Sequence, residues 1–217
     1  MNLAPSTVID AWSEWARHGA DARAGVLRHW LRQLPADTAL VAEWLLARHL
    51  PRISDALLLP GYTGETNCLR LRGRGVFVVV MDPADPVLAC AQLLNVLLAG
   101  NTALCVDNPL SVTGLESWVQ PLDSAMEALA LLDAYAVAGV SCAASHASLG
   151  DWEQAIRRAP GPLRTLLVMD RASILCDASF QGLVWEQTVT VNTAAMGGNL
   201  ALLQAVALAT EPGEAAD

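Results

Sequence analysis

The sequence contains no lysine: all 13 of its basic side chains are arginines, against 22 acidic ones. A chain without lysine cannot form a Schiff base through its own side chains and cannot supply the lysine of a phosphate-binding P-loop. The net charge of −9 also has the wrong sign for a nucleic-acid surface, which needs cations to displace counterions. We therefore expect neither lysine-dependent catalysis nor a nucleic-acid partner.

Clustered metal ligands and reactive cysteines are also missing. The five cysteines form no CxxC pair, and the four histidines are scattered, so we expect no metal site. Cys142 is the nearest candidate for a nucleophile, but its apolar neighbours are typical of a buried strand. His146, which follows that strand, is either a base carried on a loop or, with no partner motif in view, an ordinary loop histidine.

Long apolar runs are absent as well. The most apolar stretch, residues 86–106, is interrupted by polar residues and a glycine, which indicates a helix, a turn and a strand rather than a membrane span. The N-terminus lacks a basic region followed by an apolar one, so no secretory signal is expected. Together with an odd number of cysteines, this favours a reducing, cytoplasmic location.

What is present is a clear alternation of elements. Residues 6–59 carry apolar residues at helical spacing, with Pro51 expected to end the third helix, and predict an N-terminal helical segment over 1–58 that packs on the rest. From residue 76 onward, buried β-branched runs alternate with helical stretches. This pattern is typical of a doubly wound α/β domain with a mostly parallel sheet of Rossmann type. The expected strands are 75–81, 102–106, 140–144 and 164–170, with helices at 86–101, 122–135 and 149–158 and a last β-rich run at 184–191.

Three stretches carry a family resemblance. The βαβ stretch ending in "LLAGNTALCVDNP" resembles the first unit of the aldehyde dehydrogenase superfamily, in which a long helix ends in an Ala-Gly-Asn-Thr turn. Before it, "LPGYTGETN" resembles a segment of the proline utilization A proteins, which fuse proline dehydrogenase to pyrroline-5-carboxylate dehydrogenase. After it, "WEQTVTVNTAAMGGNLALL" is similar to the stretch that closes those proteins. The three matches occur in a fitting order over residues 59–204.

The resemblance implies a fold and a role. Longer members of that family carry a second, degenerate copy of the aldehyde dehydrogenase fold near the C-terminus, which covers the substrate-channelling cavity and supports oligomer contacts. The chain resembles that copy, which implies an aldehyde dehydrogenase-like domain over 59–210 and a flexible tail over 211–217. The implied partner is a proline dehydrogenase/pyrroline-5-carboxylate dehydrogenase polypeptide or a second copy of the chain.

The active-site positions of the family do not carry over. Ala84 stands where these enzymes place the asparagine that stabilises the oxyanion, and Val106 stands where they place the lysine that binds the cofactor ribose. The motifs of the nucleophilic cysteine and the general-base glutamate are not found. We therefore expect no catalytic residue and no bound cofactor, with NAD as the alternative at a vestigial site. That site would comprise Met81, Asp82, Pro83, Ala84 and Val106.

Two motifs remain as candidate sites. The first is interpreted as a backbone turn rather than a phosphate cradle and comprises Pro60, Gly61, Thr63, Gly64, Glu65 and Asn67. The second is either a partner contact or a plain turn between a strand and a helix, and it comprises Asn192, Thr193, Gly197, Gly198 and Asn199. The alternative function is the NAD-binding part of an NAD-dependent pyrroline-5-carboxylate (glutamate semialdehyde) dehydrogenase whose catalytic half comes from elsewhere. A binding module that keeps weak nucleotide affinity is a third hypothesis.

Overall fold

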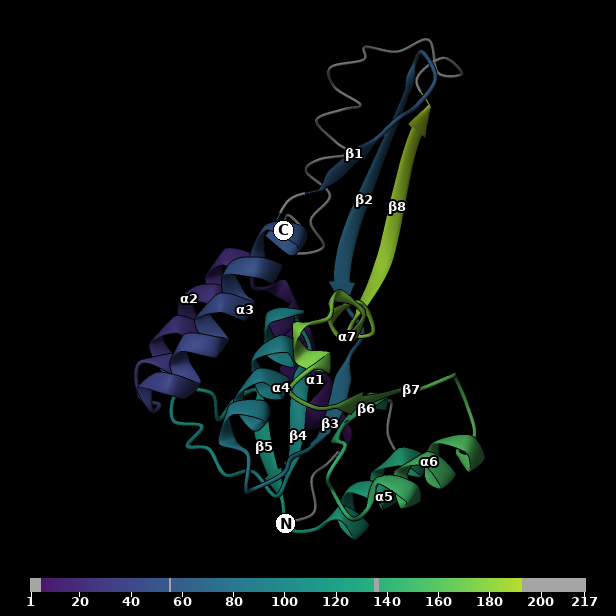
Figure 1. Ribbon diagram of the computed structural model, residues 1–217. Coiled ribbons are helices and arrows are strands. Elements are labelled where there is room, and N and C mark those ends of the chain that lie inside the picture. The colour runs from purple at the N-terminus through teal and green to yellow at the C-terminus, as the bar shows by residue number, and fades with distance from the viewer. Residues whose placement is uncertain (1–4, 55, 135–136, 193–217) are drawn as a thin grey trace.

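A computed structural model describes residues 5–54, 56–134 and 137–192 of the chain. An α/β body forms most of this part, and a narrow three-stranded sheet projects from it (Figure 1). The two sheets are separate, since no strand of one is hydrogen-bonded to a strand of the other.

The body is built on a five-stranded sheet whose neighbouring strands all run parallel. The order is β5-β4-β3-β6-β7, so the chain starts in the middle, moves to one edge and returns to the other. β3 and β4 are buried at every residue, as their β-branched and apolar sequences predict. This confirms the predicted α/β class with a parallel, doubly wound sheet. The strands are β3 (Val76–Val80), β4 (Thr102–Val106), β5 (Val119–Leu122), β6 (Val137–Ala143) and β7 (Thr165–Met169).

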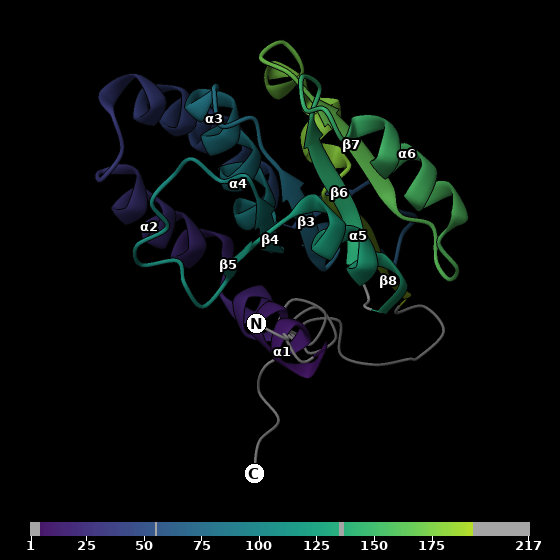
Figure 2. The same ribbon diagram turned by 90° about the horizontal axis from the view of Figure 1, so that it is seen from below.

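Helices cover both faces of this sheet (Figure 2). On one face α4 (Pro86–Leu98) is buried along most of its length, because α2 (Ala20–Leu31) and α3 (Ala36–Ser54) pack over it. On the other face lie α5 (Ala125–Ala134) and α6 (Leu149–Arg158).

The first helix, α1 (Pro5–Arg17), lies against β3 and β4 and contributes to the packing of both faces. Its Trp15 belongs to the apolar cluster around α4, and its Val8 belongs to the cluster on the opposite face. The N-terminal helices therefore share the core of the α/β body.

The projecting sheet is antiparallel and joins residues that are distant in sequence. β2 (Glu65–Gly73) lies in the middle, with β1 (Leu57–Leu59) on one side and β8 (Val184–Asn192) on the other. The short η1 (Ser173–Leu175) and α7 (Asp177–Gln181) connect β7 to β8. The last β-rich run thus pairs with β2 rather than with the parallel sheet.

Three expectations about elements need correction. Pro51 does not end the third helix, which continues to Ser54, because a proline in the last turn removes only one hydrogen bond of the helix. The helix expected from residue 122 begins at Ala125, since Leu122 belongs to β5, a strand that the sequence did not predict. β6 begins at Val137, three residues earlier than expected.

Candidate functional site

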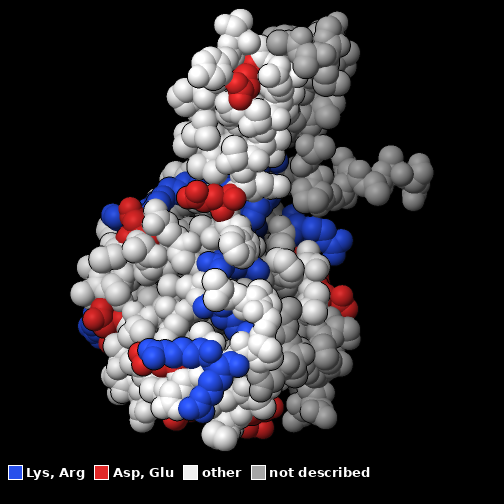
Figure 3. Space-filling model, turned by 90° about the vertical axis from the view of Figure 1, so that its right-hand side faces the viewer, with Lys and Arg blue, Asp and Glu red and all other residues white. Residues whose placement is uncertain are grey.

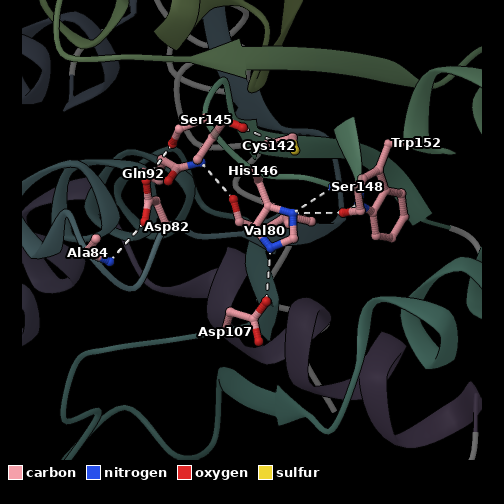
Figure 4. Close-up of polar contacts among 11 residues, drawn as sticks. Val80, Asp82, Ala84, Gln92, Asp107, Cys142, Ser145, His146, Ser148 and Trp152 are labelled. Atoms are coloured by element: carbon pink, nitrogen blue, oxygen red, sulfur yellow. Dashed lines mark hydrogen bonds and ion pairs between the residues drawn. The ribbon is translucent and has the colours of Figure 1, made fainter. Parts of the chain in front are cut away.

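The candidate site lies where the parallel strands end. The loops after β3, β4, β6 and β7 all lie at the carboxyl edge of the sheet. The chain leaves β3 toward β4 on one side and leaves β6 toward β7 on the other side, so the loops after β3 and β6 run in opposite directions. This divergence point is where open α/β sheets generally bind their ligands. The predicted vestigial site, residues 81–84, falls in the first of these loops (Figure 4).

The loop after β3 is tied to the loop after β6. Asp82 accepts a hydrogen bond from the backbone N–H of Ala84 at 2.8 Å, and its other oxygen accepts one from the hydroxyl of Ser145. These contacts, the Ser145 hydroxyl first, hold the pKa of the Asp82 carboxyl below its usual value. Met81 is fully buried, whereas Pro83 and Ala84 are exposed. Asp82 is thus engaged by the protein itself.

The N-terminus of α4, which carries the positive end of the helix dipole, is bound by the carboxylate of Asp85. Asp85 caps the helix by accepting a hydrogen bond from the N–H of Leu88 at 3.0 Å. Arg171, from the loop after β7, donates to both oxygens of Asp85 at 2.8 and 3.0 Å and lowers the pKa of this carboxyl. In Rossmann-type domains the cofactor pyrophosphate sits at the N-terminus of the first crossover helix. That position does not fit a pyrophosphate here, because a carboxylate already fills it.

Both ring nitrogens of His146 have hydrogen-bond partners. Its Nε2 lies 2.9 Å from a carboxylate oxygen of Asp107, which follows β4 and has a φ of 54°. Its Nδ1 accepts hydrogen bonds from the Ser148 hydroxyl at 2.8 Å and the Ser148 N–H at 3.2 Å. Because Nδ1 accepts, we assign the ring proton to Nε2, which donates to Asp107.

Serine, histidine and aspartate in contact are the residue types of a hydrolase triad. Here, however, Ser148 lies only two residues from His146, and its oxygen accepts a hydrogen bond from the indole N–H of Trp152 at 3.0 Å. Trp152 is fully buried, so this contact fixes the hydroxyl against the core. The arrangement closes the loop after β6 onto Asp107 (Figure 4).

The remaining sequence candidates at this edge point into the core. Val106 is fully buried among apolar side chains, and it offers no group to a cofactor. Cys142 is equally buried, and burial raises the pKa of its thiol to about 12. A thiol that stays protonated is a poor nucleophile. In the part of the chain that the structure describes, no three histidine, cysteine or acidic side chains are grouped to hold a metal ion.

The first motif forms the tip of the projecting sheet. It connects β1 to β2 in a tight turn, in which the N–H of Glu65 donates to the carbonyl of Tyr62 at 2.9 Å and Gly64 has a φ of 81°. A Cβ on Gly61 would lie 2.8 Å from the carbonyl oxygen of Glu65, so only glycine fits there. Pro60 and Thr63 are exposed. The interpretation as a backbone turn agrees with this geometry.

The two motifs meet at this tip, although they are far apart in sequence. Glu65 pairs with Asn192 in the sheet. Asn67 donates to the carbonyl of Pro60 at 3.2 Å and accepts from the Thr190 hydroxyl at 2.6 Å. Its side chain therefore links the turn to β8. Of the second motif only Asn192 lies within the described residues; Thr193, Gly197, Gly198 and Asn199 lie outside them.

Comparison with known proteins gives structural matches only. No protein-family model and no curated protein matches the chain. Among solved structures, proline utilization A with proline bound in remote sites superposes with a TM-score of 0.66 and 22% identity, over 76% of this chain and 21% of that one. A variant of proline utilization A from Bradyrhizobium japonicum gives 0.63 and 22%, over 75% and 21%. A lactaldehyde dehydrogenase gives 0.58 and 17%, over 74% and 42%.

These matches define the class of the fold. The chain has an aldehyde dehydrogenase-type α/β fold, of the kind found within proline utilization A, and it spans 21% of the length of the proline utilization A chains that it matches. Within the described ranges, every helix is too short or too polar to traverse a lipid bilayer.

Proposed function

We propose that this chain is a non-catalytic aldehyde dehydrogenase-fold module of proline catabolism. It acts as a lid, scaffold or oligomer contact for a pyrroline-5-carboxylate dehydrogenase. The observation that carries the proposal is the carboxyl edge of the sheet, where Asp82, Asp85 and Asp107 are each bound by another side chain of the same protein. Because the polar side chains at this edge bind one another, they are not positioned to bind a substrate or a cofactor. This arrangement favours a role in packing against another protein over a role in catalysis.

The contact surface in this proposal is the projecting sheet. Three of its exposed side chains are apolar and large: Leu57, Leu58 and Trp185 are 59%, 66% and 56% exposed. The guanidinium of Arg74 lies 4.1 Å from the ring centre of Trp185 and holds the indole in place. Large aromatic side chains that are fixed before binding are typical anchors of protein interfaces.

The test is co-expression with the proline dehydrogenase/pyrroline-5-carboxylate dehydrogenase polypeptide of the same organism, followed by size-exclusion chromatography with light scattering. We expect either a complex with that polypeptide or a stable oligomer of the chain alone. Trp185→Glu should abolish it, whereas Trp44→Glu, a matched change on α3 at a side chain that is 45% exposed, should not. A chain that remains monomeric alone and in the mixture would contradict the proposal.

One observation favours the alternative, the NAD-binding part of a pyrroline-5-carboxylate dehydrogenase. Asp107 follows the second strand of the first βαβ unit, and its side chain is 50% exposed. Rossmann-type domains place an acidic residue at about this point to bind the adenosine ribose hydroxyls. In that reading the chain binds NAD through Asp107 and takes its catalytic cysteine from another polypeptide.

A further inference from the structure

A cavity lies at the opposite end of the parallel sheet from the carboxyl edge. It has a volume of about 440 Å³ and is enclosed by the end of α1, the start of α2, the end of α3 and the bases of β2 and β8. Gly100, just before β4, forms part of its wall. It thus occupies the joint between the body and the projecting sheet.

The described side chains that line this cavity include three arginines. Arg17, His18, Arg23 and Arg72 line it, and no acidic residue does so among the described residues. Asp55, which follows the lining residue Ser54 in the chain, lies outside the described residues. On the face that Figure 3 displays, arginine side chains lie around the narrow joint between sheet and body, and acidic side chains lie beside them.

Arg23 is the buried member of this group, with 7% of its surface exposed. Its Nε donates to the carbonyl of Leu98 at 3.1 Å and its Nη1 donates to the carbonyl of His18. The contact with Leu98 caps the C-terminus of α4, where a cation is favourable, and the contact with His18 binds the residue that follows α1. Carbonyls carry only partial charge, and no carboxylate of the described residues pairs with Arg23. Burial, and then the charge of Arg72, lower the pKa of Arg23 to about 10.

The wall beside Arg23 is bare backbone. Gly100 has a φ of +90°, and a Cβ there would lie 3.3 Å from the Cζ of Arg23. A Cβ on Gly73 would lie 2.5 Å from the carbonyl oxygen of Gly100. Two glycines thus bring β2 and the end of α4 together while leaving the guanidinium uncovered by a side chain on this side.

Two indoles complete the cavity. Trp12 donates from its Nε1 to the carbonyl of Gly100 at 3.2 Å, which fixes its ring at the site. Trp185 lines the other side, with Arg74 stacked on its ring. The cavity therefore offers cations for an acidic group and flat apolar surfaces for the rest of a small molecule.

We propose that this cavity binds a small organic anion, with its carboxylate or phosphate group at Arg17 and Arg23 and its apolar part against the indoles of Trp12 and Trp185. The volume lies within the range of small-molecule sites, about 300–1,000 Å³. Paired arginines recognise both carboxylate and phosphate through their planar N–H groups. This site is distinct from the carboxyl edge and does not depend on the proposed packing function.

The test uses the full chain and two probes, succinate and inorganic phosphate, titrated while the indole N–H signals are followed by ¹H–¹⁵N NMR. The Trp12 signal is assigned with Trp12→Phe. We expect saturable, one-to-one shifts of the Trp12 signal with at least one probe. Arg17 is exposed, so Arg17→Gln leaves the fold intact and should weaken binding about threefold to tenfold. The matched control is Arg28→Gln, on the outer face of α2 beside Glu43, which should leave binding unchanged.

Each result decides the proposal. Saturation by succinate alone identifies a carboxylate site, and saturation by phosphate alone identifies a phosphate site. Saturation by both supports a general anion site, provided that Arg17→Gln weakens it and Arg28→Gln does not. No saturation with either probe up to tens of millimolar, or equal weakening in the two variants, overturns the proposal.

Discussion

Asn101 offers the sharpest test of how the body and the projecting sheet are held together. This residue belongs to the "AGNT" turn and is fully buried. Its Oδ1 accepts a hydrogen bond from the N–H of Gly75 at 2.9 Å, and its Nδ2 donates to the carbonyl of Leu183 at 2.9 Å. Gly75 directly precedes β3 and Leu183 directly precedes β8, so one amide joins the starts of three strands.

Replacing this side chain with alanine removes both hydrogen bonds and leaves a buried donor and a buried acceptor without partners. Each such group costs about 1–3 kcal/mol, so Asn101→Ala should lower the free energy of unfolding by about 3 kcal/mol. For a chain of this size, that loss corresponds to a fall in Tm of about 6–12 °C. Urea unfolding followed by tryptophan fluorescence measures it directly.

The control is Asn108→Ala. Among the described residues, the Asn108 side chain makes hydrogen bonds with the N–H and the carbonyl of Leu110, in its own loop. Its replacement by alanine should therefore lower the free energy of unfolding by less than about 1 kcal/mol. If both variants lose the same small amount of stability, then the Asn101 amide does not join the two parts and the reasoning fails.

Three further predictions follow from packing and titration. Gly73→Ala should lower Tm sharply, because the new Cβ would lie 2.5 Å from the carbonyl oxygen of Gly100. Gly150→Ala on α6 should leave Tm unchanged, because a Cβ there would have open space around it. Differential scanning calorimetry of both variants measures the difference. His49 is stacked on Phe180, and burial above all lowers its pKa to about 4. It is therefore neutral in the fold, so its stabilisation is complete above the unfolded pKa of about 6.5 and is lost as the pH falls toward 4. His49→Leu should flatten stability over that window in urea titrations, and an unchanged slope would rule this out. Cys176 is the exposed cysteine and the other four are buried, so iodoacetamide should modify Cys176 alone in the folded protein, as mass spectrometry of peptides can show.

Much of the fold was predictable because its signals are local. A βαβ unit is predicted without any knowledge of tertiary contacts, because two buried apolar runs, β3 and β4, flank the apolar helix α4. β5 was missed because its sequence, Val-Gln-Pro-Leu, is short and contains Pro121. A proline is tolerated there because β5 is an edge strand of the sheet. The local sequence pattern does not show whether a strand lies at the edge of its sheet.

Pairing between distant segments was the part that could not be predicted. Nothing in the arginine-bearing β2 or in β8 shows that they pair with each other, and yet this pairing brings the two motifs together at Glu65 and Asn192. The link between His146 and Asp107 was missed for the same reason, since 39 residues separate them. A usable signal did exist: Asp107 directly follows β4, His146 lies in the loop after β6, and the ends of parallel strands meet at one edge.

The carboxyl edge of the sheet is bound by its own side chains, and we propose that it is not a cofactor site. The direct measurement is a calorimetric titration of the full chain with NAD, repeated with Asp85→Ser, which keeps a helix cap but removes the charge that pairs with Arg171. We expect no saturation of the unmodified chain up to millimolar NAD. Stoichiometric binding by the unmodified chain would contradict it and establish the NAD-binding alternative.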